Sequence, residues 1–238
     1  MKKIAQPILE LSNISRSDKK SEIDRLSLSI TYGDSFTVLH SCPDNVSLLT
    51  EILLGRVFPK KGKVFFKGDD ITGRKNNFGV IKKNPQLPKR KTTAEFAAAP
   101  LLKRGLSRMI ADTLIKKEMT QFGIDEIADS QITKLPLDSA LQAIFFSAYM
   151  CSHEMMAIDE PYSQLPDEER KKKIEWLNDF RKKQKLSLLV FTENIDVALQ
   201  LGDYVMILDE HASSAGIVAI IGDKNKARKR IEQILERT

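Results

Sequence analysis

Asp159 and Glu160 stand side by side after the apolar run EMMAI at 154–158. A short apolar run between polar segments is typical of a buried strand, so both carboxylates are expected at a strand end. Two carboxylates in that position can bind a cation, or they can be held by hydrogen bonds as part of the framework. The residues alone leave both interpretations open, and we favour the second.

A second candidate segment is the polar loop SCPDN at 41–45. It follows the β-rich apolar run SFTVLH at 35–40 and precedes the helical pattern VSLLTEILLG at 46–55. The loop is therefore expected between the end of a buried strand and the start of a helix.

Buried β runs alternate with helical patterns along the chain. Strands are predicted at 7–15, 25–30, 35–40, 63–68, 78–81, 154–159, 187–192, 204–208 and 216–222. Helices are predicted at 46–55, about 93–127, 139–150, about 167–184, 194–202 and the C-terminus. This alternation favours a mainly parallel, wound α/β sheet.

Length and composition limit the class of protein. With 238 residues, 42% of them hydrophobic, the chain can bury a core as one large domain or two unequal lobes. No run approaches the roughly 20 apolar residues of a membrane-spanning helix, and the N-terminal apolar run is shorter than a signal peptide's ~7–15 residue core. Cys42 and Cys151 have no metal-ligand spacing, which suits a reducing compartment. We therefore expect a cytoplasmic location.

The net charge of +6 comes largely from basic clusters at 82–91, 169–185 and 224–230. Such clusters can bind nucleic acid or anionic lipid. One Trp, four Tyr and no nucleic-acid motif give no stacking surface for bases. We interpret the clusters as solvated helix faces and loops and expect no nucleic-acid partner. A basic nucleic-acid or lipid binder remains the weakest of three functional interpretations.

The order of these elements resembles the ABC-type ATPase cassette over nearly the whole chain. The closest stretches are ILLGRVFPKKGKVFFKGDDITG (52–73), MMAIDEPYSQLPDEERKKKIEWL (155–177) and DVALQLGDYVMIL (196–208). Residues 97–124 resemble the helical subdomain of the branch that serves lipoprotein release, macrolide export and cell division.

The resemblance implies a P-loop NTPase-like α/β fold in one domain over 1–238. Its RecA-like core, with a mainly parallel sheet and an N-terminal antiparallel β part, would comprise 1–92 and 151–238. A helical subdomain would comprise about 93–150.

The family's phosphate loop reads G-x-x-x-x-G-K-[ST], and its backbone N–H groups and lysine hold the phosphates. The matching residues run from His40 to Ser47. His40 and Asn45 replace the glycines, Val46 replaces the lysine, and Asp44 adds a negative charge. One charge pair at about 4 Å is worth ~1 kcal/mol in water and ~4 kcal/mol at an effective dielectric constant near 20. We therefore expect Asn45, Val46 and Ser47 to form a degenerate cofactor site that does not hold ATP, although Ser47 remains a possible magnesium ligand.

The other family motifs are altered too. The signature L-S-G-G-Q corresponds to 135–139 (LPLDS), the switch histidine to Glu193, and the magnesium-sensing glutamine to Lys83. The D-loop S-A-L-D corresponds to 163–166 (SQLP), and the adenine-stacking aromatic to Ser17.

Asp159 and Glu160 survive, and the resemblance implies a role for each. In the family the aspartate orders magnesium and the glutamate polarises the attacking water. Asp159 is thus the possible Mg²⁺ ligand and Glu160 the residual catalytic residue. With its neighbours replaced, we expect no cofactor; a residually active chain would use ATP and Mg²⁺.

These observations favour a pseudo-ATPase, a non-hydrolysing structural or regulatory subunit of an ABC-transporter-like membrane complex. The implied partners are an integral membrane permease-like subunit, which would hold the chain on the inner face of the membrane, and a second cassette, identical or paralogous. The docking face is expected at Lys82, Lys83, Gln86, Lys89, Arg90 and Lys91. The alternative is a divergent but active ATP-binding subunit that energises export or lipoprotein release.

Overall fold

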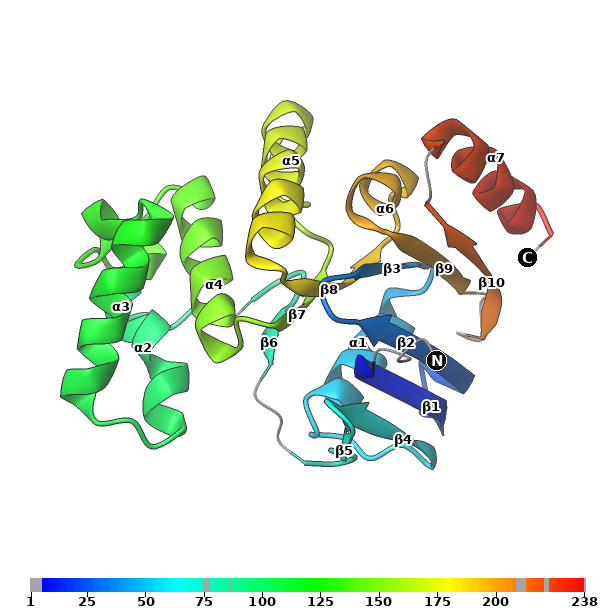
Figure 1. Cartoon of the computed structure of the whole chain (residues 1–238), viewed down its shortest axis with the longest axis horizontal. Coiled ribbons are helices and arrows are strands. Elements are labelled where there is room, and N and C mark those ends of the chain that lie inside the picture. Colours follow the sequence, from blue (N-terminus) through cyan, green and yellow to red (C-terminus); the bar gives the residue numbers. More distant parts are fainter. Residues whose placement is uncertain (1–5, 75–77, 86, 209–212, 221–222, 238) are drawn as a thin grey trace, which may run out of the picture.

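The computed structural model describes residues 6–74, 78–85, 87–208, 213–220 and 223–237. The larger of two sheets runs through the middle of the molecule, the smaller lies beside it, and a group of helices lies at one end (Figure 1). Among the described residues, no helix combines the length and the apolar character that a bilayer crossing requires.

The larger sheet has six strands in the order β10-β9-β3-β8-β7-β6. Their bounds are β3 (Ser35–Leu39), β6 (Gly79–Ile81), β7 (Met155–Asp159), β8 (Ser187–Thr192), β9 (Tyr204–Leu208) and β10 (Ser214–Ala219). All neighbours pair in parallel except β10, which is antiparallel to β9. The parallel strands therefore present their C-terminal ends at one edge of the sheet.

The smaller sheet is antiparallel, in the order β2-β1-β4-β5. Its strands are β1 (Pro7–Ser17), β2 (Glu22–Thr31), β4 (Lys61–Phe66) and β5 (Asp69–Asp70). This sheet and helix α1 (Pro43–Leu53) cover one face of the larger sheet. On that face Met155 and Ala157 of β7 share a core with Val46 of α1.

Met156 and Ile158 point to the opposite face, because successive side chains of a strand alternate. There they join a core with helices α4 (Leu137–Cys151) and α5 (Asp167–Gln184). Burial on both faces explains why β7 and β8 read as continuous apolar runs in the sequence. Helices α6 (Ile195–Leu201) and α7 (Lys224–Leu235) build a third core with β9 and β10.

The helical pattern at 93–127, expected as one segment, forms two helices, α2 (Thr93–Lys103) and α3 (Arg108–Phe122). A capping box between Thr92 and Glu95 starts α2. The chain turns at Gly105, whose φ of 88° is a conformation that glycine adopts more readily than other residues. Ser107 then caps α3. Short 3₁₀ turns at Asp125–Ile127 and Ile132–Lys134 lead on to α4.

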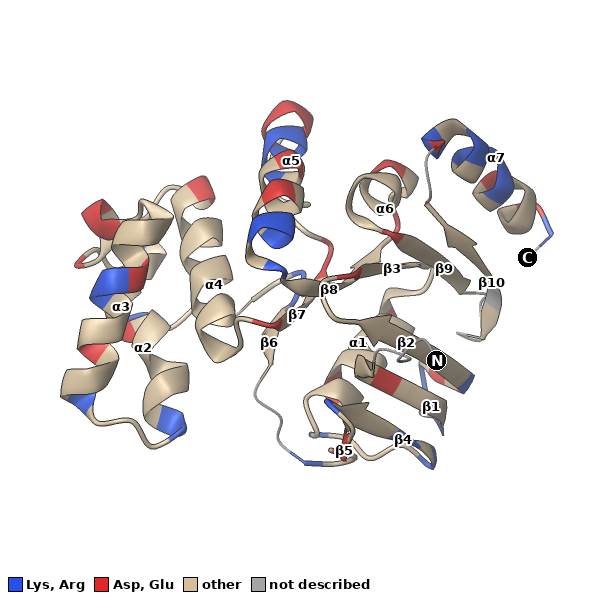
Figure 2. Ribbon diagram, in the orientation of Figure 1, with Lys and Arg blue, Asp and Glu red and all other residues tan. Residues whose placement is uncertain are grey.

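The basic clusters at 169–185 and 224–230 fall on α5 and α7 (Figure 2). Acidic residues lie between the cations of α5, whereas Glu232 follows the cations of α7. The first turn of α5 is acidic and its last turn is basic. This arrangement complements the helix dipole. These helix faces are largely exposed, which fits the interpretation as solvated surfaces.

Arg181 is a buried charge that joins α5 to the larger sheet. Its guanidinium donates to both carboxylate oxygens of Asp203, at 3.0 and 2.9 Å, and to the carbonyl of Gly33 at 3.3 Å. The Asp203 carboxylate also accepts the backbone N–H of Ser35 at 2.8 Å. The pair thus fixes the starts of β3 and β9 beneath α5.

Replacing Asp203 by Asn should destabilise the fold by about 2 kcal/mol, because it leaves the Arg181 charge buried beside a neutral partner. Urea unfolding followed by circular dichroism measures the change. The control is Asp196→Asn, since Asp196 pairs with Arg228 on the surface, and it should cost no more than about 0.5 kcal/mol. Equal losses in the two variants would contradict a structural role for the buried pair.

Candidate functional site

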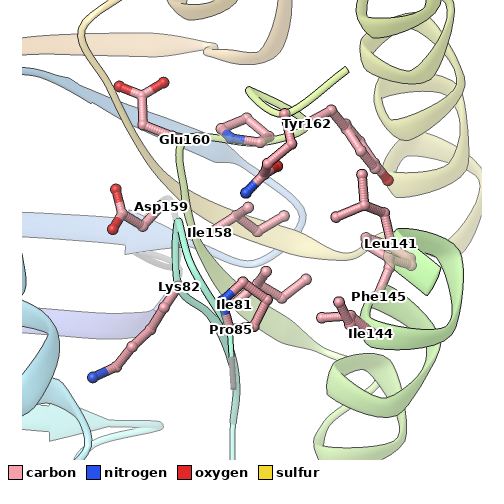
Figure 3. Close-up of a pocket in the computed structure, with 12 residues that line it drawn as sticks. Ile81, Lys82, Pro85, Leu141, Ile144, Phe145, Ile158, Asp159, Glu160 and Tyr162 are labelled. Carbon is pink, nitrogen blue, oxygen red and sulfur yellow. The ribbon is translucent and has the colours of Figure 1, made fainter. Parts of the chain in front are cut away.

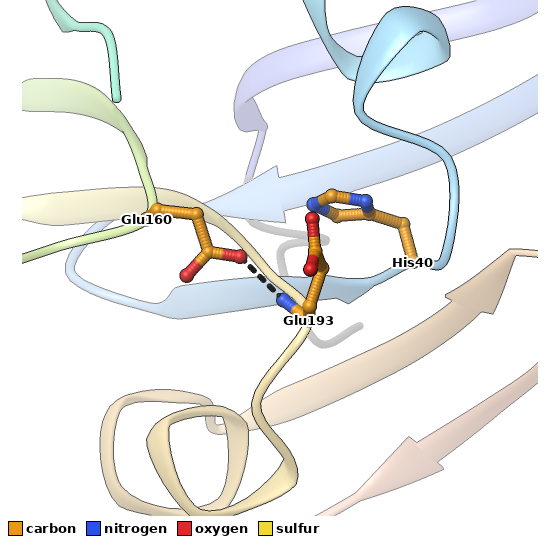
Figure 4. Close-up of side chains that lie close together, drawn as sticks. All are labelled: His40, Glu160 and Glu193. Carbon is orange, nitrogen blue, oxygen red and sulfur yellow. Dashed lines mark hydrogen bonds between the residues drawn. The ribbon is translucent and has the colours of Figure 1, made fainter. Parts of the chain in front are cut away.

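Three strand ends meet at the C-terminal edge of the parallel sheet. His40 follows β3, Glu160 follows β7 and Glu193 follows β8. One nitrogen or oxygen atom of each side chain lies within 4.8 Å of the others. Figure 4 shows the imidazole of His40 beside the carboxylate of Glu193, with Glu160 across from them. The sheet thus brings together residues that are far apart in the sequence.

The carboxylate of Glu160 is held by hydrogen bonds to the end of β8. One oxygen accepts the hydroxyl of Thr192 at 3.1 Å, and the other accepts the backbone N–H of Glu193 at 2.6 Å. Glu160 is buried, and its φ of 49° lies in the left-handed region, which costs a non-glycine residue roughly 1–2 kcal/mol. Its own N–H bonds the carbonyl of Phe191 at 2.9 Å. These bonds fit the framework interpretation of this carboxylate.

His40 is a buried imidazole with unsatisfied nitrogens. The residue is 7% exposed, and neither Nδ1 nor Nε2 has a hydrogen-bond partner within the described part of the chain. Its backbone N–H bonds the carbonyl of Thr192 at 3.2 Å, which places the ring at the sheet edge. Burial lowers the pKa of His40 to about 4, opposed by the charge of Glu193 and assisted by that of Lys83. The ring is therefore neutral at pH 7.

Asp159 and Lys83 complete the charges at this edge. An oxygen of Asp159 accepts the backbone N–H of Lys83 at 3.3 Å. Burial raises the pKa of Asp159, and the carboxylate of Glu160 raises it further. The ammonium of Lys83 lies 3.7 Å from a carboxylate oxygen of Glu193. When all four groups are ionised, Asp159, Glu160, Glu193 and Lys83 carry a net charge of −2.

The segment matched to the phosphate loop is mostly helical. Helix α1 starts at Pro43, earlier than the predicted 46, so only residues 40–42 lie between β3 and α1. The start of a helix can bind an anion through its free N–H groups, but Pro43 at the start of α1 has no N–H to offer. The predicted loop at 41–45 is therefore corrected to a short turn at 40–42 followed by a helix, and the loss of ATP binding stays a prediction.

The predicted cofactor residues of α1 point in different directions. Val46 is 1% exposed and packs in the core between the sheets. Asn45 is also buried, and its side-chain oxygen accepts the N–H of Glu22 at 2.8 Å. Ser47 is exposed. The structure therefore does not bring these three side chains together.

The predicted docking residues divide into two groups. Lys82 pairs with Glu51 of α1, and Lys83 pairs with Glu193. Exposed cations follow at Lys89, Arg90 and Lys91, whereas Gln86 lies outside the described residues. Docking itself stays a prediction for this surface.

A small cavity lies beside Asp159 and Glu160. Its volume is about 20 Å³, and Leu141 and Phe145 of α4 line it together with Ile158 of β7 (Figure 3). A space of this size holds about one water molecule. It is a packing gap and not a nucleotide site.

His40 replaces a glycine of the family's phosphate loop, and Glu193 replaces its switch histidine. The sequence did not predict that these two side chains lie close together. The available signal was that both directly follow buried strands, and the ends of parallel strands share one edge of a sheet.

No family model matches the sequence. Over 204 residues the chain is 25% identical to the molybdate/tungstate import ATP-binding protein WtpC of Pyrococcus horikoshii, a match that covers 84% of this chain but 59% of that protein. Over 209 residues it is 23% identical to the taurine import ATP-binding protein TauB of Pseudomonas aeruginosa, covering 88% and 80% of the two chains. A solved ATP-binding cassette of an ABC transporter, in its ADP conformation, matches with a TM-score of 0.78 at 16% identity, covering 97% and 98%.

These comparisons confirm the predicted fold class. The chain has the α/β fold of an ATP-binding cassette, with a mainly parallel sheet, an antiparallel β part and a group of helices. The resemblance to ATP-binding domains of ABC transporters is likewise confirmed. Both named relatives serve import, and neither supports the predicted lipoprotein-release, macrolide-export and cell-division branch.

The buried neutral state of His40 should make stability depend on pH. Its folded pKa of about 4 is below the value of 6.5 for an exposed histidine. As pH falls, the unfolded chain therefore binds the proton first. The contribution of His40 is complete above pH 6.5 and is lost towards pH 4. Between these values the wild type should lose about 3 kcal/mol more than His40→Gln.

Urea unfolding in buffers containing a chelator measures this difference. The control is His153→Gln, since His153 is exposed, and it should follow the wild-type curve. Parallel pH curves for the wild type and His40→Gln would contradict the neutral, buried imidazole.

Proposed function

We propose that this chain is the cassette subunit of an ABC transporter for import, and that it serves there without hydrolysing ATP. The fold and the relatives support the cassette role. The observation that carries the second part is Val46, which is buried in the core at the position matched to the family's phosphate-binding lysine. Helix α1 contains no Lys or Arg that could replace that lysine.

Electrostatics supports the same proposal. Asp44 lies in the first turn of α1, and Asp159, Glu160 and Glu193 outnumber Lys83 at the sheet edge. A triphosphate brought to this edge would meet negative groups and lack its usual lysine. Each charge pair at about 4 Å is worth ~4 kcal/mol at an effective dielectric constant near 20. Pro43 also removes one backbone N–H from the start of α1.

On this proposal the chain contributes structure or regulation to its complex. An integral membrane permease-like subunit would hold it on the cytoplasmic face of the membrane, and a second cassette, identical or paralogous, would pair with it. Import is the proposed direction because both named relatives are import proteins.

The second candidate is an active ATP-binding subunit of an import system. The names of the relatives favour it, and Asp159 and Glu160 keep the family's positions at the end of β7. It requires Glu160 to polarise water with oxygens that also accept hydrogen bonds from Thr192 and Glu193.

Isothermal titration of the purified chain with MgATP should show no saturable binding, with any dissociation constant weaker than ~1 mM. The physical reason is the missing lysine and the negative charge of Asp44. Titration with Mg²⁺ alone corrects for binding of the ion. A dissociation constant in the micromolar range would overturn the non-hydrolysing proposal.

Phosphate release separates the two candidates directly. On our proposal the wild type and Glu160→Gln show the same background rate. The active alternative predicts that Glu160→Gln abolishes release and that Glu168→Gln, at an exposed position of α5, retains it. That second pattern would identify the chain as a working ATPase.

Docking can be tested on the exposed cations Lys89, Arg90 and Lys91. Changing all three to Glu should reduce the membrane-bound fraction of the protein in its source cells several-fold, because the change reverses the charge of the proposed face. The matched control changes Lys171, Lys172 and Lys182, which are exposed on α5, and should retain wild-type binding. An equal loss in both variants would indicate a general charge effect and reject this face.

A further inference from the structure

We infer that His40, Glu160 and Glu193 form a binding site for a divalent transition metal ion of the zinc class, which joins the ends of β3, β7 and β8. The inference does not rest on the proposed function, because every ligand is a side chain of this chain and no nucleotide takes part.

The geometry places three ligand atoms around one point. They lie within 4.8 Å of one another. A tetrahedral ion with ligand bonds of ~2.0–2.1 Å holds its ligand atoms roughly 3.4 Å apart. The ligand atoms must therefore approach one another by at most about 1.4 Å. Glu193 can move towards the other two because its side chain is 45% exposed and can change rotamer. Three protein ligands would leave a fourth position for water, as in zinc sites with three protein ligands.

The buried imidazole supplies the observation that points to a ligand. His40 is only 7% exposed, and neither ring nitrogen has a hydrogen-bond partner within the described residues. A buried polar group without a hydrogen bond costs roughly 1–3 kcal/mol. A metal ion at one nitrogen would remove that cost, and Figure 4 shows the ring facing the two carboxylates.

The charges at the site favour a cation. Glu160 and Glu193 supply two negative charges, and Asp159 lies close enough to interact with both. Lys83 is the opposing cation, 3.7 Å from Glu193. A divalent ion would displace the Lys83 ammonium from this carboxylate.

The donor set selects the class of ion. Magnesium and calcium prefer oxygen ligands alone, whereas imidazole suits zinc and other transition metals. One nitrogen and two carboxylates therefore favour zinc. The bonds of Glu160 to Thr192 and Glu193 already orient one ligand, as outer-shell hydrogen bonds do in metal sites.

Calorimetric titration of the metal-free chain with Zn²⁺ should show one saturable site, and Co²⁺ should give the visible absorption of a tetrahedral ion with a nitrogen ligand. His40→Ala should weaken Zn²⁺ binding by about 100-fold or more. Glu193→Gln should weaken it by at least about 10-fold, and its exposed position preserves the fold if His40→Ala does not fold. The control is His153→Ala, which should bind as the wild type does.

Lys83→Met provides a test of opposite sign. Removing the competing ammonium should tighten Zn²⁺ binding several-fold. The inference is overturned if the wild type binds no Zn²⁺, if both His40→Ala and Glu193→Gln bind it as the wild type does, or if Cys42→Ser abolishes binding. Because no nucleotide is present, these results are independent of the ATP titration.

Discussion

The carboxylate of Glu160 joins the ends of two neighbouring strands, and the arrangement of the sheet edge depends on it. Its oxygens accept the hydroxyl of Thr192 and the N–H of Glu193, while the carbonyl of Thr192 accepts the N–H of His40. The ends of β7, β8 and β3 are therefore connected through one short hydrogen-bonded segment. The left-handed φ of Glu160 is a strained conformation that these bonds maintain.

The start of α1 sets which groups this edge presents. The helix begins at Pro43, and Val46, at the position matched to the family's lysine, faces the core. The sheet edge instead presents an imidazole and carboxylates. An arrangement of this kind repels polyphosphate and attracts cations, so the proposed loss of nucleotide binding and the inferred metal site have the same electrostatic origin.

The fold survives these changes because it depends on other residues. The cores contain apolar side chains from both faces of β7 and β8, and the Arg181–Asp203 pair fixes α5 over the sheet. The Arg181–Asp203 pair lies outside the family's nucleotide motifs, whereas Val46, at the position of the family's lysine, is part of one of the cores. A cassette fold can therefore persist with an altered site, and likeness of fold to solved cassettes does not establish the chemistry.

The sequence alone determined where most strands and helices lie, because apolar runs buried on both faces and helical spacing are local patterns, but it did not predict the break between α2 and α3. The elements at 167–184, 187–192 and 204–208 match the structure residue for residue. It also determined that the family's lysine and glycines are absent. Only the tertiary structure decided that α1 starts at Pro43, that Val46 is buried, and that His40 meets Glu160 and Glu193. His40 is 120 or more positions from Glu160 and Glu193 in the sequence. The distances between these side chains follow from the pairing of parallel strands, which no local pattern encodes.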